Sequence, residues 1–330
     1  MLQEPTFLRI LNDHPGEPVL VDVGASGGAP KEWLPLASRS WYIAFDPDQR
    51  EMTEVTTDGT FKRKTVVNEA ITHDPSNREV RFNLTRSPFC SSILTPDHEL
   101  VANFFGGEKF DVLDETVVKA STLNEVMQRI GCTKIDWLKL DTQGTDRRIY
   151  DSLSETLRHG LLAVDLEPGL RGAYLEEDLF GDVHKSMLRD GFWLSKMETK
   201  GFVRMRQTTL DHLSKNEPDL DQKYVEKAVR RTPGWTELRY LRSIGSLKAS
   251  GASKRDIVLL WAIATMDEQY GFGLDLASHW EASYGLDATC KSMRQGSLEQ
   301  IKAQHARMNA DAQRSRLKGR IKNVMRRFIP

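Results

Sequence analysis

Apolar residues over positions 19–206 fall into short continuous runs, and segments with helical spacing separate these runs. A short apolar run between glycine, proline or aspartate is typical of a buried strand. Glu79–Leu84 instead alternates between polar and apolar residues, which predicts a strand at the edge of a sheet. Strands that alternate with helices predict an α/β unit with a mostly parallel sheet. The strands expected from this pattern are Val19–Val23 and Trp41–Phe45, both buried, together with Lys64–Val67, Val117–Ala120, Ile135–Asp141, Leu161–Leu166 and two short strands within Phe192–Arg206.

Helices are expected between these strands. Ser121 and Thr122 place a hydroxyl four or three residues before Glu125, a capping-box pattern in which a hydroxyl and a glutamate bond the free N–H groups at a helix start. This pattern predicts a helix that runs to Ile130. The other helices expected here are 3–12, which we expect to cover the sheet, Pro30–Ala37, Gln49–Val55, Asp146–Arg158 and Asp178–Asp190.

The pattern changes near residue 210, where strand-like runs give way to apolar residues three or four positions apart. Such spacing predicts helices. We therefore expect two domains, an α/β domain over 1–210 and an α-helical domain over 211–330. The helices expected in the second domain are 224–229, 237–247, 254–267 and 298–328.

The composition is that of an ordinary soluble protein, with 39% hydrophobic residues, 28% charged residues and a formal net charge of −1. This overall charge predicts neither a nucleic-acid nor a membrane partner. The three cysteines are far apart and form no CxxC pair, which argues against a disulfide framework and a cysteine-based zinc site. Together with an N-terminus that lacks the features of a signal peptide, they predict a cytoplasmic protein.

The first predicted strand leads into a loop of small residues, Gly24–Ala29. Because glycine has no Cβ, a ligand can approach the backbone of this loop closely. A strand, a glycine turn and a helix form a nucleotide-type site at the carboxyl end of a sheet. Asp46 ends the next predicted strand, where an acidic side chain is placed to accept both hydroxyls of a ribose.

The glycine spacing argues against a bound pyrophosphate. The dinucleotide fingerprint is G-x-G-x-x-G, and this chain has Ala25 and Ser26 where the second glycine is needed. A Walker A lysine is absent from the sequence as well. A ribose and a compact amino-acid moiety remain, and together they describe S-adenosylmethionine (SAM).

Several motifs, taken in order and spacing, resemble the FkbM-type methyltransferases over about residues 19–206. The resemblance implies a Rossmann-like class I methyltransferase fold with a seven-stranded sheet, and O-methylation of a hydroxyl on a saccharide, glycan precursor or secondary metabolite. Asp46 and Gln143 depart from it, since many members carry glutamate at both positions. The motifs are Val21–Gly28, Phe45–Asp48, Asn68–Ile71, Ser91–Ser92, Thr122–Val126 and Ile135–Gly144.

The resemblance also implies roles for individual residues. The glycine loop lines the methionine part of SAM, Asp22 meets its ammonium group directly or through water, and Asp46 binds the ribose. Glu69 and Ala70 flank the adenine, although a purely structural role for Glu69 is equally compatible with the sequence. The implied cofactor site consists of Asp22, Gly24, Ala25, Ser26, Gly27, Asp46, Glu69, Ala70 and Asp141.

The resemblance places Ser91 and Ser92 near the cofactor or the acceptor. A second interpretation, in which both serines are helix-capping hydroxyls in a loop, is about equally well supported by the sequence.

Transfer to an alcohol requires that the hydroxyl lose a proton, and a general base helps that step. Asp141 and Glu167 lie at carboxyl ends of predicted strands, and we expect Asp141 as the base with Glu167 second. Asp165 shares this location, but an ion pair inside the fold explains it equally well. His98 and His184 are discounted, because a lone histidine is more often structural. The spacing does not require a metal.

The C-terminal segment is basic, with seven Lys or Arg and no acidic residue between Arg314 and Arg327. A basic amphipathic helix can lie on an anionic membrane surface. The favoured alternative is a helix that packs on a neighbouring domain or on a second subunit, which makes a homodimer one expected arrangement. A nucleic-acid partner is not expected, because no aromatic residues interleave the basic ones. The apolar residues of this segment are Leu317, Ile321, Val324 and Phe328.

We therefore expect a SAM-dependent methyltransferase that acts on a small-molecule or glycan acceptor. Two rival hypotheses remain open. The first is an NAD-dependent oxidoreductase, which shares the strand, glycine and acid layout but needs the missing glycine pattern. The second is a non-catalytic core that serves as an interaction or membrane-docking module through the basic tail.

Overall fold

The computed structural model describes residues 6–14, 16–25, 28–48 and 59–328. The chain divides into two compact units. One consists of Gly16–Ala252, and the other joins Met1–Pro15 to Ser253–Pro330. The helix expected over Gln49–Val55 lies outside the described residues.

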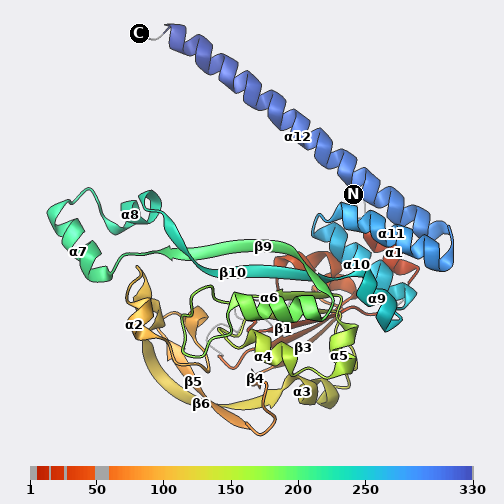
Figure 1. Ribbon diagram of the computed structural model, residues 1–330, viewed down its shortest axis with the longest axis horizontal. Coiled ribbons are helices and arrows are strands. Elements are labelled where there is room, and N and C mark those ends of the chain that lie inside the picture. Colours follow the sequence, from red (N-terminus) through yellow and green to blue (C-terminus); the bar gives the residue numbers. More distant parts are fainter. Residues whose placement is uncertain (1–5, 15, 26–27, 49–58, 329–330) are drawn as a thin grey trace. The chain divides into compact units, whose positions relative to one another are not determined.

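The larger unit is built on a seven-stranded, mostly parallel sheet, which gives it a mixed α/β, Rossmann-like architecture (Figure 1). The strand order is β3-β2-β1-β7-β8-β10-β9, and β10 runs antiparallel to both of its neighbours. All residues of β1 and β2 are buried, as expected for central strands covered on both faces. The strands are β1 (Val19–Val23), β2 (Trp41–Phe45), β3 (Arg63–Val67), β7 (Trp137–Leu140), β8 (Ala163–Leu166), β9 (Phe192–Val203) and β10 (Arg231–Arg242).

The path of the chain creates a crevice beside β1. The chain proceeds from β1 outward to β2 and β3, and later returns to place β7 on the other side of β1. Such a reversal of strand order is a topological switch point, and ligands of open α/β sheets bind at the carboxyl ends of the strands that flank it. Val23 ends β1 and pairs with Phe45 of β2 and with Leu140 of β7, so the three carboxyl ends meet at one edge.

Each face of the sheet has its own cover. Apolar residues at alternate positions of the strands pack against the helices that follow β6, β7 and β8. On the opposite face the 3-10 helix η1 (Lys31–Arg39) inserts Trp33, whose ring centroid lies 5.6 Å from that of Trp137. The helices of the first face are α3 (Leu123–Arg129), α4 (Asp146–Asp151), α5 (Glu155–Gly160) and α6 (Phe180–Arg189).

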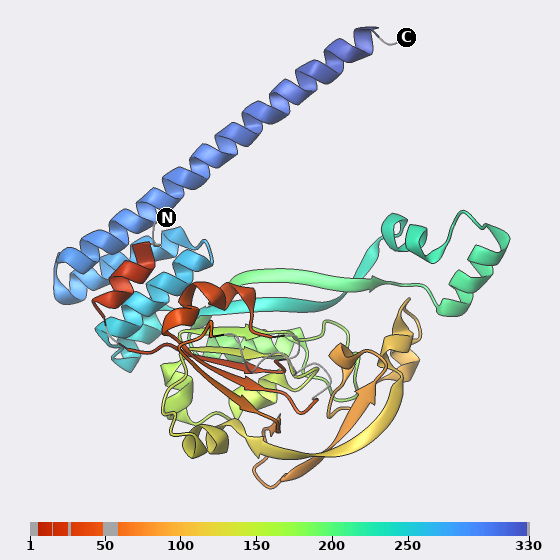
Figure 2. The ribbon, with the colours of Figure 1, turned by 180° about the vertical axis from the view of Figure 1, so that it is seen from behind.

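A second sheet of three strands, in the order β4-β6-β5, lies beside the first, and Figure 2 shows its long curved strands from behind. β5 is at the edge of this sheet, as its alternating pattern predicts. The predicted capping box is present, because Thr122 and Glu125 each bond the other's backbone N–H. The elements of this part are β4 (Ala70–Thr72), β5 (Glu79–Thr85), η2 (Pro88–Cys90), α2 (His98–Val101), η3 (Gly107–Phe110) and β6 (Val112–Thr122).

The prediction for residues 192–247 is wrong in two respects. Phe192–Val203 is one long strand rather than two short ones, and the helix expected over 237–247 is largely the end of β10. Only α9 (Ile244–Ser250) is helical there. Pairing with β8 and β9 on both sides makes this segment a strand, although its apolar spacing also suits a helix.

The α/β unit therefore extends to Ala252 and not to residue 210. The long pair β9 and β10 carries α7 (Gln207–Asn216) and α8 (Gln222–Ala228) at its tip, clear of the sheet in both ribbon views (Figures 1 and 2).

The smaller unit is helical. Trp280 and Leu260 are buried in it, and α1 contacts α10 and α12. The helix expected over 3–12 thus belongs to this unit rather than to the cover of the sheet. Its elements are α1 (Thr6–Asn12), α10 (Lys254–Met266), α11 (Tyr270–Tyr284) and α12 (Ala288–Phe328).

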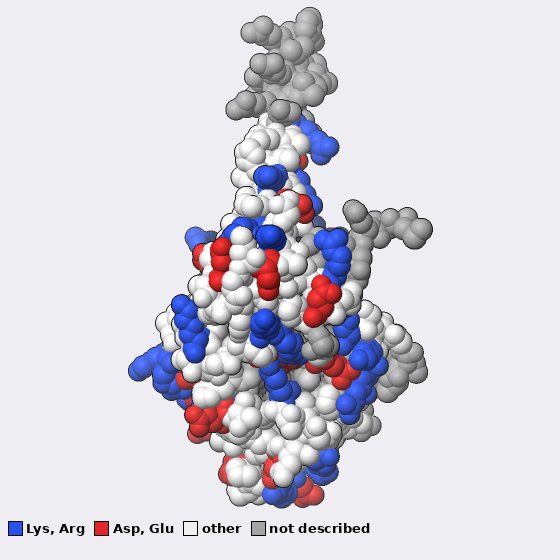
Figure 3. Space-filling model, turned by 90° about the vertical axis from the view of Figure 1, so that its right-hand side faces the viewer, with Lys and Arg blue, Asp and Glu red and all other residues white. Residues whose placement is uncertain are grey.

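The expected C-terminal helix over 298–328 is confirmed in its backbone as part of α12, and the side chains of residues 301–312 are exposed. On the face drawn in Figure 3, basic and acidic residues are interspersed. Among the described residues, no helix combines the length and the apolar character needed to cross a bilayer.

Candidate functional site

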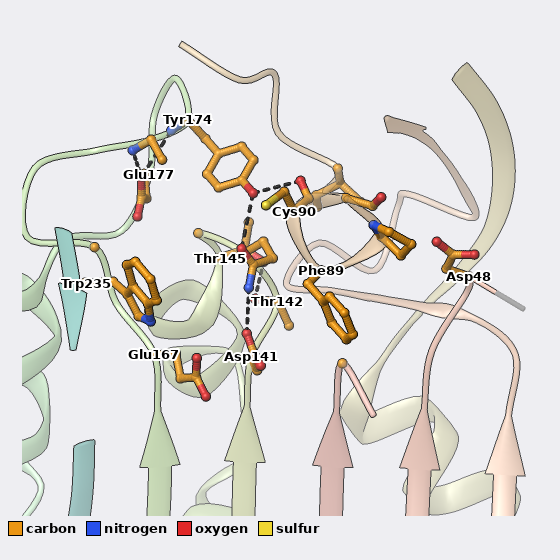
Figure 4. Close-up of a pocket in the computed structure, with 18 of the residues that line it drawn as sticks. Asp48, Phe89, Cys90, Asp141, Thr142, Thr145, Glu167, Tyr174, Glu177 and Trp235 are labelled. Carbon is orange, nitrogen blue, oxygen red and sulfur yellow. Dashed lines mark hydrogen bonds between the residues drawn. The ribbon is translucent and has the colours of Figure 1, made fainter. Parts of the chain in front are cut away.

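A cavity of about 470 Å³ opens at the carboxyl ends of the central strands, within the α/β unit. We call its strand-end side the floor, formed by Gly24, Asp46, Asp141 and Glu167. Asp141 and Glu167 stand at the tips of neighbouring strands, and Tyr174 and Cys90 face them from across the cavity (Figure 4). We use the name roof for the aromatic and basic residues of the lining that follow β5 in the sequence, together with Cys90. They are Phe89, Cys90, Lys109, Phe110, Arg171, Tyr174, Phe202 and Trp235.

Gly24 is required by the packing of the strand ends. Its φ of +85° is one that side chains rarely adopt, and a Cβ at this position would lie 2.0 Å from the carbonyl oxygen of Asp141. Only glycine therefore allows the loops after β1 and β7 to approach each other. Ala25, expected beside the methionine part of SAM, is buried and does not line the cavity. Ser26 and Gly27 lie outside the described residues.

Asp46 lies at the end of β2 and lines the floor, as predicted. The side chain is 5% exposed, and its Oδ1 accepts the N–H of Asp48 at 2.8 Å. Burial raises the pKa of Asp46 to about 6. One carboxylate oxygen thus has a fixed donor, and the group remains available to hydroxyl donors in the cavity.

Asp141 is held by partners on both oxygens. Its Oδ1 accepts the side-chain N–H of Gln143 at 2.7 Å, and its Oδ2 lies 3.3 Å from Nζ of Lys139. Gln143 has a φ of +55°, and its own carbonyl accepts the hydroxyl of Ser92 at 2.9 Å. The hydroxyl of Tyr174 lies 3.1 Å from Oε1 of Gln143, which extends the network to the roof. Gln143 therefore orients Asp141 without adding a second carboxylate.

Lys139 lies below Asp141 and is a residue that the sequence reasoning missed. Its Nζ is 3.5 Å from Oδ1 of Asp22, the neighbouring residue on β1. Burial alone lowers the pKa of Lys139, but Asp22, Asp141 and Glu167 outweigh this and raise it above the ordinary value. The signal was present in the sequence, because Lys139 and Asp141 are two positions apart in a strand and share a face.

Asp22 does not line the cavity, so its position does not support a direct contact with the ammonium group of SAM. It is 1% exposed, accepts the hydroxyl of Tyr42 at 3.1 Å and pairs with Lys139. Burial raises the pKa of Asp22. A residue in the middle of a strand points to a face of the sheet, whereas one just after the strand can point to its edge. Asp22 therefore contributes to the support beneath the site.

Glu167 follows β8 and lines the floor, as predicted. Burial, and then the charge of Asp141, raise the pKa of Glu167 to about 9. The side chain therefore keeps its proton at neutral pH. Its backbone N–H donates to Oδ2 of Asp146 at 3.0 Å, and Oδ1 of Asp146 accepts the N–H of Thr142 at 2.9 Å. Asp146 thereby ties together the two strand ends that carry the acidic groups.

Glu69 and Ala70 both border the cavity, but the carboxylate of Glu69 is committed elsewhere. It lies 2.6 Å from Nζ of Lys119, 2.6 Å from the hydroxyl of Ser121 and 2.9 Å from Nη2 of Arg129. Burial raises the pKa of Glu69, but these three donors outweigh burial and lower it to about 2. The geometry favours the structural interpretation of Glu69.

The two serines differ in position. Ser91 lines the cavity, and its Oγ accepts the N–H of Thr85 at 3.1 Å. Ser92 does not line it, because its hydroxyl donates to Gln143 and accepts the N–H of Leu94. Ser92 thus holds the loop of Gln143 and is not placed to contact an acceptor.

Three residues that the sequence analysis considered for the site lie outside the cavity. Asp165 accepts two hydrogen bonds from Arg239, at 2.8 and 3.0 Å, so it forms the internal ion pair considered for it. His184 contacts the hydroxyl of Tyr240 at 2.9 Å, and neither it nor His98 lines the cavity. Among the described residues, no group of three or more His, Cys, Asp or Glu is arranged to hold a metal ion.

The site thus combines a floor of carboxyl groups with a roof of aromatic and basic side chains. Comparisons with protein-family models and with curated proteins return no match for this chain. What the site does must therefore be argued from its own geometry and chemistry.

The roof contains the other residues that the sequence reasoning missed. Its aromatic and basic members come from the loop after β8, from η2 and η3, and from β9 and β10. These segments are far apart in the sequence, and no local pattern joins them. The single local signal is Gly234-Trp235, a glycine and a large aromatic residue inside a strand, which is typical of a bulge.

Proposed function

We propose that this protein transfers a methyl group from SAM to a hydroxyl of a small-molecule or saccharide acceptor. The observation that carries the proposal is the acidic floor at the switch point between β1 and β7, together with Asp46 at the end of β2, the strand next to β1. Asp46 occupies the position at which an acidic residue binds the ribose of a nucleoside cofactor. The seven-stranded sheet agrees with the fold that the FkbM resemblance implies.

The floor suits a cationic ligand. Four carboxyl-bearing residues that follow β2, β7 and β8 line the cavity, and its volume of about 470 Å³ lies within the roughly 300–1,000 Å³ of small-molecule sites. SAM carries positive charges on its sulfonium and ammonium groups, which these residues attract. The pyrophosphate of NAD would instead meet carboxylates of the same sign, so the floor disfavours the oxidoreductase hypothesis. The four residues are Asp46, Asp48, Asp141 and Glu167.

When bound, SAM supplies a methyl group that is already activated by the positive sulfur. The protein therefore has to exclude water, orient the acceptor and receive the proton of its hydroxyl. Asp141 is the carboxylate placed to receive that proton, because Gln143 and Lys139 fix its orientation at the end of β7. Glu167, at the neighbouring strand end, is protonated at neutral pH and is able to donate a hydrogen bond to a bound ligand. A cation in the cavity lowers the pKa of Glu167, which then becomes a second group able to receive the proton.

Calorimetric titration of the full chain with SAM and with NAD tests this proposal. At pH 8, where the Asp46 carboxyl is ionised, we expect Asp46→Ala to weaken SAM binding about 10- to 100-fold, because a charge-assisted hydrogen bond is lost. Asp219→Ala is the matched control, since it removes the same charge from an exposed position outside the cavity. Saturable binding of NAD instead of SAM, or equal SAM affinity in wild type and Asp46→Ala, contradicts the proposal.

Transfer of a labelled methyl group gives a second readout. Wild-type protein incubated with labelled SAM is expected to modify hydroxylated acceptors, such as sugars and sugar acids. The reaction should be absent when SAM is omitted. Tight SAM binding without transfer to any hydroxylated compound would argue against the acceptor class.

A further inference from the structure

The roof presents a continuous row of aromatic rings to the cavity. The ring centroids of Trp235 and Phe202 are 5.2 Å apart, those of Phe202 and Phe110 are 6.5 Å apart, and those of Phe110 and Tyr174 are 5.7 Å apart. All four residues line the cavity. The rings are tilted or edge-on to one another, and Trp235 and Phe202 are the two that are partly exposed. These two give an apolar surface against which a ring-shaped molecule can lie.

Arg171 lies beside this row, in the loop that follows β8, and also lines the cavity. Its Cζ is 3.4 Å from the ring centroid of Phe104, so the guanidinium stacks on that ring. Nε and Nη1 are buried, and neither has a hydrogen-bond partner among the described residues. Buried donors on a cation are costly when they have no acceptor.

The nearest acidic side chain does not supply the missing acceptor. Glu177 influences the charge of Arg171, but its carboxylate accepts the backbone N–H groups of Ala173 and Tyr174. Gly234 also lies against the guanidinium, since a Cβ there would lie 3.6 Å from Nη2 of Arg171. The guanidinium is therefore held by packing, and its Nε and Nη1 donors are not used within the described residues.

A second cation lies on the roof. Lys109 is exposed, lines the cavity and places its Nζ 5.9 Å from the ring centroid of Phe202. The roof side thus carries two basic side chains beside aromatic rings, together with Glu177, whose carboxylate is bonded by backbone N–H groups. Because the floor carries acidic groups, a ligand with a negative group is favoured with that group at the roof.

We propose that the acceptor is a ring-shaped hydroxylated molecule that bears an oxyanion, a carboxylate or a phosphate, and that Arg171 binds this oxyanion while the aromatic row supports the ring. The proposal rests on the proposed function, because it assigns the acceptor of the same site. The planar guanidinium matches the geometry of both oxyanions. The acidic floor repels the oxyanion, so the acceptor is bound with its neutral hydroxyl towards Asp141.

The test compares sugars that differ in one group. Glucose, glucuronate and glucose 6-phosphate share a ring, but only the last two carry an oxyanion. Each is titrated by calorimetry into the full chain, with and without S-adenosylhomocysteine. We expect the better of the two charged sugars to bind at least about tenfold more tightly than glucose, because it gains a charge-assisted hydrogen bond. The preference between the two charged sugars identifies the oxyanion as carboxylate or phosphate.

Three variants assign the effect to Arg171. Arg171→Met keeps apolar bulk against Phe104 and is expected to remove the preference for the charged sugar. Arg171→Lys keeps the charge without the planar fork and is expected to retain part of it. Arg204→Met is the matched control, because Arg204 also faces the ring of Phe104, at 5.6 Å, but is exposed and does not line the cavity.

The outcomes separate this inference from the proposed function. A charged-sugar preference that is lost in Arg171→Met and kept in Arg204→Met supports the inference. Equal binding of glucose and the charged sugars, no saturable binding of either charged sugar, or a preference that survives in Arg171→Met overturns it. SAM affinity is measured on the same preparations, so normal SAM binding without an oxyanion preference contradicts the inference alone. A preference for the oxyanion in a protein that does not bind SAM contradicts the proposed function alone.

Discussion

The floor and the roof of the cavity satisfy their polar groups in different ways. On the floor, Asp141 is bonded by Lys139 and Gln143, and Asp46 is bonded by the backbone of Asp48. On the roof, Arg171 keeps buried donors without a partner among the described residues. The floor is thus organised before any ligand binds, which is the arrangement that the proposed cofactor requires. The roof keeps the basic side chain that we propose for the acceptor.

A substitution at Gly24 is expected to have the largest effect on the floor. We expect Gly24→Ala to destabilise the protein by about 3 kcal/mol or more, because strain at positive φ adds to a clash with the carbonyl of Asp141. Gly28→Ala is the matched control, since Gly28 also has a positive φ but a Cβ there meets nothing within 4 Å. That change should cost only about 1–2 kcal/mol from backbone strain. Denaturant unfolding measures both, and equal losses would show that the strand ends do not depend on this approach.

Glu167 gives a pH-dependent test of the floor. Its pKa is raised to about 9 in the folded protein from an ordinary value near 4.5, so between these values the folded state holds a proton that the unfolded state has released. Stability must then fall as pH rises through this window, by at most about 1.4 kcal/mol per pH unit. Glu167→Gln carries no titrating proton and should remove this slope.

Unfolding of wild type and Glu167→Gln at pH 5 and pH 8 makes the comparison. We expect the variant to gain at least about 1 kcal/mol relative to wild type between these two pH values. Parallel pH profiles of the two proteins would contradict the protonated state assigned to Glu167.

The smallest effect is expected from the helical unit. Every residue that lines the cavity belongs to Gly16–Ala252, so a chain that ends at Ala312 should bind SAM as the full chain does. Flotation with anionic vesicles checks the basic segment in the same pair of proteins. Because we favour packing on protein over a membrane role, we expect equal flotation. A full chain that floats when the shortened one does not would establish the membrane role instead.

The sequence predicted the floor better than the roof, and the reason is local. β1 and β2 follow directly from continuous apolar runs, and Asp46, Asp141 and Glu167 were found because each follows the end of such a run. Asp22 was expected at the cavity because a sequence motif does not distinguish a residue inside a strand from one just beyond its end.

The roof depends on contacts between distant segments. The end of β10 was mistaken for a helix, since Leu238, Leu241 and Ile244 are three positions apart and only pairing with β8 and β9 makes the segment before Ser243 a strand. With β10 missed, Trp235 and the domain boundary were missed as well. Arg171 gives no signal of its own, because its role follows from Phe104 and Gly234, which lie far away in the sequence.

The irregularity in β10 carries an evolutionary consequence. Pro233 pairs with Gly201 and Trp235 pairs with Lys200, so Gly234 is an extra residue with no partner of its own on β9. Loss of one codon at this point leaves the pairs on either side with the same partners, so the ladder becomes regular and no face is reversed. Such a change alters the backbone that contacts Arg171 and leaves the strand ends of β1, β2 and β7 as they are, so the roof can diverge among descendants of the gene while the floor is inherited unchanged.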